Sequence, residues 1–166
     1  MSTRCQIEFK HVRKYLGSKE VVDRRTIYRH SDGYPEGVIP DLKRFLSWNA
    51  ERNNDIEYQT ANFIYWSKRQ YEDDYFNKEE KKKVHWFDNA NDQLGCGFGV
   101  CANDELHGDI EYYYEVVREV RESTKNKFST KTSIFVYEVK QKDYSKPVTR
   151  KHLQLKQTVI IKEVKA

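Results

Sequence analysis

Long apolar runs are missing from this sequence. No stretch approaches the roughly 18 uninterrupted apolar residues that a membrane helix requires, so we expect no membrane partner. The first ten residues, MSTRCQIEFK, alternate apolar and polar side chains, and we expect no signal peptide there. Only three cysteines occur, an odd number and too few for a secreted disulfide scaffold. These features predict a cytoplasmic protein with free or buried thiols.

Apolar side chains are also scarce, at 37% of the chain, whereas charged side chains make up 34%. Aromatic residues, at 14% and including twelve tyrosines, supply much of the missing core-forming surface. A disordered chain would be poor in aromatic residues. A chain of 166 residues usually forms one domain. We therefore expect a single folded domain over residues 1–166, with a heavily charged surface.

The net charge of +4 is distributed unevenly along the chain. Residues 1–117 hold 17 Lys/Arg and 21 Asp/Glu, whereas residues 118–166 hold 13 Lys/Arg and only 5 Asp/Glu. Such an excess of cations is typical of a surface that meets nucleic acid or another polyanion. Within it, QKDYSKPVTRKH (141–152) combines cations with a tyrosine, as single-stranded nucleic acid requires. The alternative is that these cations neutralise the acidic part of the same fold.

Hydrophobic periodicity predicts strands at both ends of the chain and helices between them. Period-two alternation indicates strands over residues 5–10, 21–30, 94–100, 109–117, 132–140 and 153–164. Helical spacing indicates helices over about 40–53 and about 55–82, the second with a solvated charged tail at 77–83. Short polar connections do not make parallel crossovers, so the last four strands should be successive antiparallel neighbours. The predicted fold is α+β: one twisted antiparallel sheet of about six strands, with two helices inserted after strand two and packed on one face.

The segment YRHSDGYP, residues 28–35, combines the end of a strand with a turn. Its Asp-Gly pair and its proline fit the geometry of the turn. Because side chains alternate along a strand, Tyr28 and His30 share one face. Arg29 lies on the other face, where it must reach the edge or pair with an acid. The candidate ligand-binding residues in this segment are Tyr28, Arg29 and Tyr34, and the candidate catalytic residues are His30 and Asp32.

The segment HGDIEYYYEV, residues 107–116, has titratable side chains at alternate positions. As a strand it would place His107, Asp109 and Glu111 on one face. Imidazole and carboxylate groups bind divalent cations, and crowded carboxylates raise one another's pKa. Together with His30 these residues would suit metal-assisted hydrolysis or phosphate chemistry. The structural alternative is a solvated sheet face whose acids pair with lysines of the last strands.

Glycines at 95, 97 and 99 recur with the period of a strand, unlike the G-x-G-x-x-G fingerprint that opens a helix. We expect them to leave a shallow trough that aromatic side chains of the helices fill. No nucleophile elbow, phosphate loop or zinc-protease motif occurs, and no motif identifies a cofactor.

The two segments together resemble a group of short, uncharacterised prokaryotic and phage- or plasmid-associated proteins. In that group a Tyr-Arg-His-x-Asp-Gly-Tyr-Pro segment precedes a helix, and a Gly-Asp-Ile-Glu-Tyr strand follows later. The matching positions are residues 28–30, 32–35 and 108–112. The resemblance implies a small cytoplasmic accessory protein and no particular activity.

Three hypotheses follow. The first is a non-enzymatic binding protein of viral or mobile-element origin, which binds a protein or a small ligand where the YRHSDGYP turn meets Asp109 and Glu111. The second is a metal-assisted hydrolase or phosphate-directed enzyme with the catalytic residues His30, Asp32, His107, Asp109 and Glu111. The third is nucleic-acid binding by residues 118–166. The first two require the two segments to lie side by side.

Overall fold

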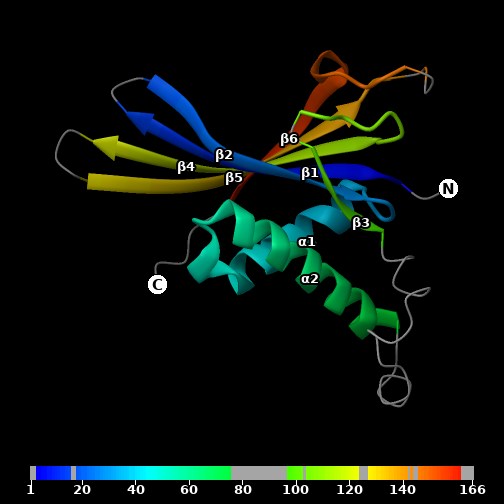
Figure 1. Ribbon diagram of the computed structural model, residues 1–166, viewed down its shortest axis with the longest axis horizontal. Coiled ribbons are helices and arrows are strands. Elements are labelled where there is room, and N and C mark those ends of the chain that lie inside the picture. The colour runs from blue at the N-terminus through cyan, green and yellow to red at the C-terminus, as the bar shows by residue number, and fades with distance from the viewer. Residues whose placement is uncertain are drawn as a thin grey trace.

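The computed structural model describes residues 3–15, 18–75, 97–102, 104–123, 127–141, 143 and 146–161. These residues form one sheet of six strands and two α-helices, and both helices lie on the same side of the sheet (Figure 1). The predicted α+β class is confirmed. The strands are β1 (Cys5–Tyr15), β2 (Ser18–Arg29), β3 (Phe98–Cys101), β4 (Tyr112–Ser123), β5 (Lys127–Val139) and β6 (Leu153–Ile161).

The helices are α1 (Pro35–Trp48) and α2 (Ile56–Tyr75), and the short 3-10 helix η1 (Ala50–Arg52) lies between them. The first helix was predicted to begin at Pro40, which is too late. Pro35 occupies the first turn instead, and Pro40 lies inside the helix. Both prolines suit a first turn by residue type, but Val38 and Ile39 are buried in the core. Because packing supplies most helical stability, their burial extends the helix toward the N-terminus.

Two predicted features fall outside the described residues: the charged tail at 77–83 and the start of the third strand at 94–96. Neither α1 nor α2, nor any other described helix, is long and apolar enough to cross a membrane.

The sheet is mixed, so the prediction of a purely antiparallel sheet is wrong. The strand order is β3-β2-β1-β4-β5-β6. β1 pairs with β4 in parallel, with Cys5 opposite Tyr112 and Ile7 opposite Tyr114. The other neighbouring strands pair antiparallel. β3 therefore lies beside β2 and not beside β4.

The connection between β3 and β4 explains why the predicted pairing of these two strands is wrong. β3 and β4 lie on opposite sides of the β1–β2 hairpin, and only ten residues connect them, although a parallel crossover usually needs a dozen or more residues. The chain crosses over β1 at Gln6, whose side chain is fully buried. Gln6 donates to the Glu105 carbonyl at 2.9 Å and accepts from the His107 N–H at 3.0 Å. These two hydrogen bonds hold the short path in place.

The core lies between the sheet and the two helices. Alternate strand residues such as Ile7 and Tyr114 face the helices and have no exposed surface. The rings of Phe9, Phe45 and Phe63 form the centre, with centroid separations from 5.0 to 6.0 Å. Burying one such ring contributes about 2–3 kcal/mol. This packing fixes which side of the sheet carries the helices.

The opposite side of the sheet, called the open face below, carries the other alternating set of strand residues. Neither α1 nor α2 covers it (Figure 1). Because paired residues share a face, the register assigns to it Gln6, Glu8 and Lys10 of β1, Tyr113 and Glu115 of β4, and Phe135 and Tyr137 of β5. The open face therefore gathers charged, polar and aromatic side chains from three neighbouring strands.

Candidate functional site

The two segments singled out in the sequence meet on the open face. Tyr28, on β2, donates a hydrogen bond from its hydroxyl to Oδ2 of Asp109 at 3.0 Å. Its ring stacks on His107, with a centroid separation of 4.7 Å. Nδ1 of His30 lies 3.4 Å from the Tyr28 hydroxyl. The structure therefore brings these four residues, called the Tyr28 cluster, into one place.

Backbone contacts explain why the cluster forms. The His30 N–H donates to the Gly97 carbonyl at 2.7 Å, and a Cβ atom added at Gly97 would lie 2.2 Å from Cβ of His30. This glycine therefore makes room for His30, and not for an aromatic side chain of the helices as predicted. On the other side, Arg4 pairs with Asp109 at 3.0 Å, and its carbonyl accepts from the Glu111 N–H at 2.9 Å. The second segment is thus fixed to the start of β1, where Tyr28 of the first segment lies opposite Gln6.

The candidate nucleophiles in and beside the cluster are protonated groups. Burial, and then the hydrogen bond to Asp109, raise the pKa of Tyr28 to about 12, so its phenol acts as a donor at neutral pH. Cys101 Sγ lies 3.6 Å from His107 Nε2. Burial raises the pKa of the Cys101 thiol, whereas a nucleophilic cysteine needs a lowered pKa. The described part of the chain also has no group of three or more His, Cys, Asp or Glu placed to hold a metal ion.

The other predicted site residues do not join the cluster. Arg29 lies on the helix side of the sheet and pairs with Asp41 of α1 at 2.9 Å, which confirms that it pairs with an acid. Asp32 has a positive φ of 54° and forms the turn before α1. Tyr34 is the N-cap of α1. Glu111 is exposed, and no described side-chain contact joins it to the cluster.

Acids of the 107–116 segment form ion pairs, but not with the lysines that were expected. Asp109 pairs with Arg4, which precedes β1. Lys156 of β6 pairs instead with Glu138, on the adjacent strand, at 2.8 Å. The cross-strand partners of the predicted acids are therefore different from those proposed.

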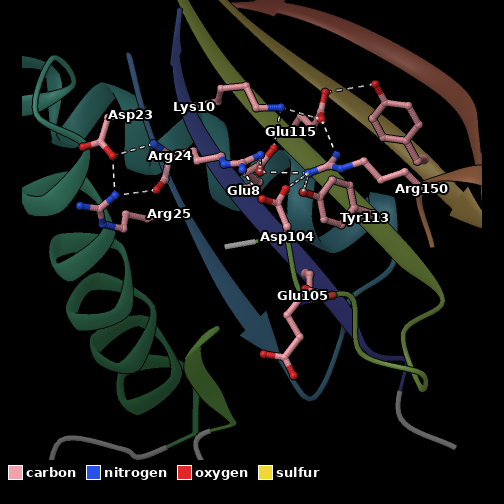
Figure 2. Close-up of polar contacts among 12 residues, drawn as sticks. Glu8, Lys10, Asp23, Arg24, Arg25, Asp104, Glu105, Tyr113, Glu115 and Arg150 are labelled. Atoms are coloured by element: carbon pink, nitrogen blue, oxygen red, sulfur yellow. Dashed lines mark hydrogen bonds and ion pairs between the residues drawn. The ribbon is translucent and has the colours of Figure 1, made fainter. Parts of the chain in front are cut away.

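A second polar group, which the sequence analysis did not single out, lies next to the Tyr28 cluster along β1. Its centre is Glu8, a carboxylate with no exposed surface. Glu8 pairs with Lys10 at 2.6 Å and with Arg150 at 3.2 Å, as Figure 2 shows. Arg24 lies 4.0 Å from Glu8 and also pairs with Asp104. These residues, together with Glu115, are called the Glu8 network.

Lys10 and Arg150 connect Glu8 to Glu115 of β4, at 2.8 and 3.1 Å from its carboxylate. Burial opposes ionisation of Glu115, but the hydrogen bond from Lys10 and the charges of Lys10 and Arg150 outweigh it. The pKa of Glu115 is therefore held below its ordinary value. Arg150 comes from the basic segment 141–152, so one cation of this predicted nucleic-acid loop neutralises acids within the fold.

Beyond the Glu8 network, toward the tips of the hairpins, the open face is hollowed into a groove of about 440 Å³. Four strands contribute cations to its lining, namely Lys10, Lys14, Lys19, Arg121 and Lys131. Its acidic residues are Glu115 and Glu119, and its apolar surface comes from Val117, Phe135 and Tyr137. The groove therefore combines positive charge with aromatic surface.

Positive charge is in excess in this groove. Glu119 pairs with Lys14 at 2.8 Å and with Arg121 at 2.6 Å. Lys19 and Lys131 are exposed, and no acid of the described chain lies within ion-pair distance of either. These two lysines are therefore available to an anion from solution.

An apolar strip borders the groove on the β5–β6 side. Phe135 and Tyr137 contribute from β5. The register places Leu155 of β6 opposite Tyr137, and Ile160 opposite Ser133, so both share the open face. Leu155 is 52% exposed and Ile160 is 59% exposed. The half-buried Phe135 and Tyr137 and the exposed Leu155 and Ile160 are together called the apolar strip.

Comparisons with protein-family models, curated proteins and solved structures find no match to this chain. One signal in the sequence pointed toward the groove: the excess of cations after residue 117, which supplies Arg121 and Lys131. The contribution of Lys10 and Lys14 depends on the parallel pairing of β1 with β4, which the sequence analysis did not predict.

Proposed function

We propose that this protein is a binding protein that holds a phosphate-bearing, anionic ligand in the groove of the open face. The observation that carries the proposal is the charge of the lining, five cations against two carboxylates. Lysine and arginine are the side chains that bind phosphate groups. Lys19 and Lys131, which have no described acidic partner, would contact the ligand directly.

Binding rather than catalysis is supported by the state of the reactive groups on this face. The Tyr28 phenol and the Cys101 thiol both have raised pKa values and stay protonated at neutral pH. Histidine and cysteine do not occur among the described residues that line the groove. The groove thus offers charge and surface to a ligand, without an activated nucleophile.

The Glu8 network supports the proposal in a second way, because it makes one end of the groove rigid. Lys10 and Glu115 belong to both the network and the groove lining. Buried Glu8 and half-exposed Arg150 hold these two side chains in fixed positions. A site that is already ordered loses less conformational entropy when a ligand binds.

The test is binding of the full chain to inorganic polyphosphate and to a single-stranded oligonucleotide of mixed sequence, measured by fluorescence anisotropy at about 50 and about 200 mM salt. We expect binding that weakens at the higher salt concentration. Lys131→Glu should weaken it by about tenfold, because it replaces a cation of the groove with an anion. Lys43→Glu makes the same charge change at an exposed residue of α1, on the helix side, and should have a much smaller effect. Absence of binding to both probes, or equal losses in the two variants, would contradict the proposal.

A further inference from the structure

We propose that the ligand is a single-stranded nucleic acid, with its phosphates on the cations of the groove and its bases on the apolar strip. This identification rests on the proposed function and names the class of ligand for the same groove. It depends on how charge and apolar surface are arranged across the sheet.

Charge and apolar surface occupy different parts of the open face. Lys14 on β1, Lys19 on β2, Arg121 on β4 and Lys131 on β5 contribute cations toward the hairpin end of the groove. Phe135 and Tyr137, further along β5, contribute apolar surface toward the other end, with β6 beside them. A single nucleic-acid strand has the same separation, with phosphates along one edge and flat, weakly polar bases along the other. The groove therefore matches a nucleic-acid strand in both charge and polarity.

The Tyr137 ring of the strip is held in position before any ligand binds. Phe135 and Tyr137 are two residues apart on one strand, which separates them by about 7 Å along the sheet. The Tyr137 hydroxyl donates to Glu115 Oε2 at 3.2 Å, and its ring centroid lies 6.2 Å from that of Tyr113. A fixed tyrosine ring with a phenylalanine beside it offers a platform on which bases of any sequence stack.

The exposed part of the strip extends this platform toward the sheet edge. Leu155 and Ile160 lie on β6, the outermost strand on this side, and expose more than half of their surface. A polyanion without bases would make no favourable contact with this apolar surface. A duplex keeps its base faces stacked inside the helix and cannot place them on a strip. A single strand can place its phosphates on the cations and its bases on the apolar strip at the same time.

The test compares ligands of equal charge that differ in their bases. The full chain is titrated with labelled oligothymidylate of about 12 nucleotides, within the range of known single-strand sites, and with an abasic strand carrying the same number of phosphates. The duplex of the same length and polyglutamate are added as competitors. We expect oligothymidylate to bind at least about tenfold more tightly than the abasic strand, because each stacked base adds affinity. Neither competitor should displace it at equal concentration.

Variants of the apolar strip test whether the bases of the ligand bind there. Leu155→Ser and Ile160→Ser change exposed side chains, and Phe135→Leu removes a ring while keeping an apolar side chain. Each should reduce the preference for bases, measured as the ratio of the affinities for oligothymidylate and for the abasic strand, by about threefold or more. Val100→Ser changes an apolar side chain that is 66% exposed on β3, at the opposite edge of the sheet, and serves as the matched control.

The outcomes separate this identification from the proposed function. Equal, salt-sensitive binding of the base-bearing and abasic strands would leave the proposed function standing and overturn the nucleic-acid identification. The identification would also be overturned if the duplex or polyglutamate competed as well as the single strand, or if the three strip variants kept the full preference for bases. Absence of binding to every anion would overturn the proposed function itself.

Discussion

The guanidinium of Arg150 lies 3.2 Å from the carboxylate of Glu8, although the two residues are 142 positions apart in the chain. Glu8 has no exposed surface, whereas the side chain of Arg150 is 42% exposed. A buried carboxylate is destabilising unless cations and hydrogen-bond donors surround it. Arg150 therefore compensates Glu8 and also fastens the β5–β6 connection to the centre of the sheet (Figure 2).

Replacement of Arg150 by methionine should destabilise the fold. Glu8 would remain buried with Lys10 and the more distant Arg24 as its cations. We expect the free energy of unfolding to fall by about 2 kcal/mol, because a buried charge loses one partner. Urea unfolding measures the change. Lys151→Met, at the exposed neighbouring residue, is the control. If the two variants unfold at the same urea concentration, the contact between Arg150 and Glu8 does not stabilise the protein.

Acid stability should depend on Glu115. Its pKa in the folded state lies below the ordinary value of 4.5, so the unfolded state takes up a proton first as the pH falls. The stabilisation is fully present above about pH 4.5 and is lost as the pH falls through the folded pKa. Glu115→Gln should therefore be less stable than the wild type at neutral pH, and the difference should shrink as the pH falls below about 4.5.

Urea unfolding measured at neutral pH and at several pH values below about 4.5 tests this expectation. Glu51→Gln, at an exposed residue of η1, should match the wild type throughout. A difference between Glu115→Gln and the wild type that is constant with pH would show that Glu115 does not carry the linkage.

Tyr28→Phe should weaken the contact between the two segments without removing it. The variant loses the hydrogen bond to Asp109 at 3.0 Å but keeps a ring stacked on His107. We expect the free energy of unfolding to fall by about 1 kcal/mol at neutral pH, measured by urea unfolding. Tyr65→Phe removes the same atom from an exposed tyrosine of α2 and should be neutral. Identical stability of both variants would mean that the hydrogen bond adds nothing to the fold.

Gly97→Ala and Gly99→Ala form a matched pair on one strand end. At Gly97 a Cβ atom would lie 2.2 Å from Cβ of His30, whereas at Gly99 nothing lies within 4 Å of the added atom. The first change should destabilise the protein by about 2 kcal/mol, because His30 or the backbone must shift. The second should change stability by less than about 0.5 kcal/mol. Thermal unfolding of the two variants measures this, and similar melting temperatures would refute the close approach of His30 to Gly97.

Local periodicity predicted the features of the fold that depend on neighbours in sequence. Tyr112, Tyr114 and Val116 are alternate residues of the predicted strand, and all three contribute to the core between sheet and helices. The separation of Tyr28 from Arg29 onto opposite faces followed from the same rule. These assignments need no knowledge of which strands pair.

Features that depend on distant contacts were not predicted. β3 lies beside β2 because Phe98 packs against Phe63 of α2, at 6.2 Å between ring centroids, and under the guanidinium of Arg29, at 5.5 Å. No local pattern marks Phe98 for these partners. The Glu8 network was missed for the same reason, since Glu8 in an alternating strand has the pattern of an ordinary exposed acid. Its burial follows only once Arg150 and Lys10 are placed around it.

The parallel pairing of β1 with β4 also bears on how the chain is made. When synthesis has reached only the end of α2, β2 is available to pair with one edge of β1. The other edge of β1 stays unpaired until β4 (Tyr112–Ser123) has been synthesised. The central strand thus spends the longest time with half of its backbone groups unpaired. Pairing between distant segments slows folding, and a bare strand edge recruits other chains. The yield of native protein should therefore respond to conditions during translation, such as temperature, more than the stability of the finished fold would suggest.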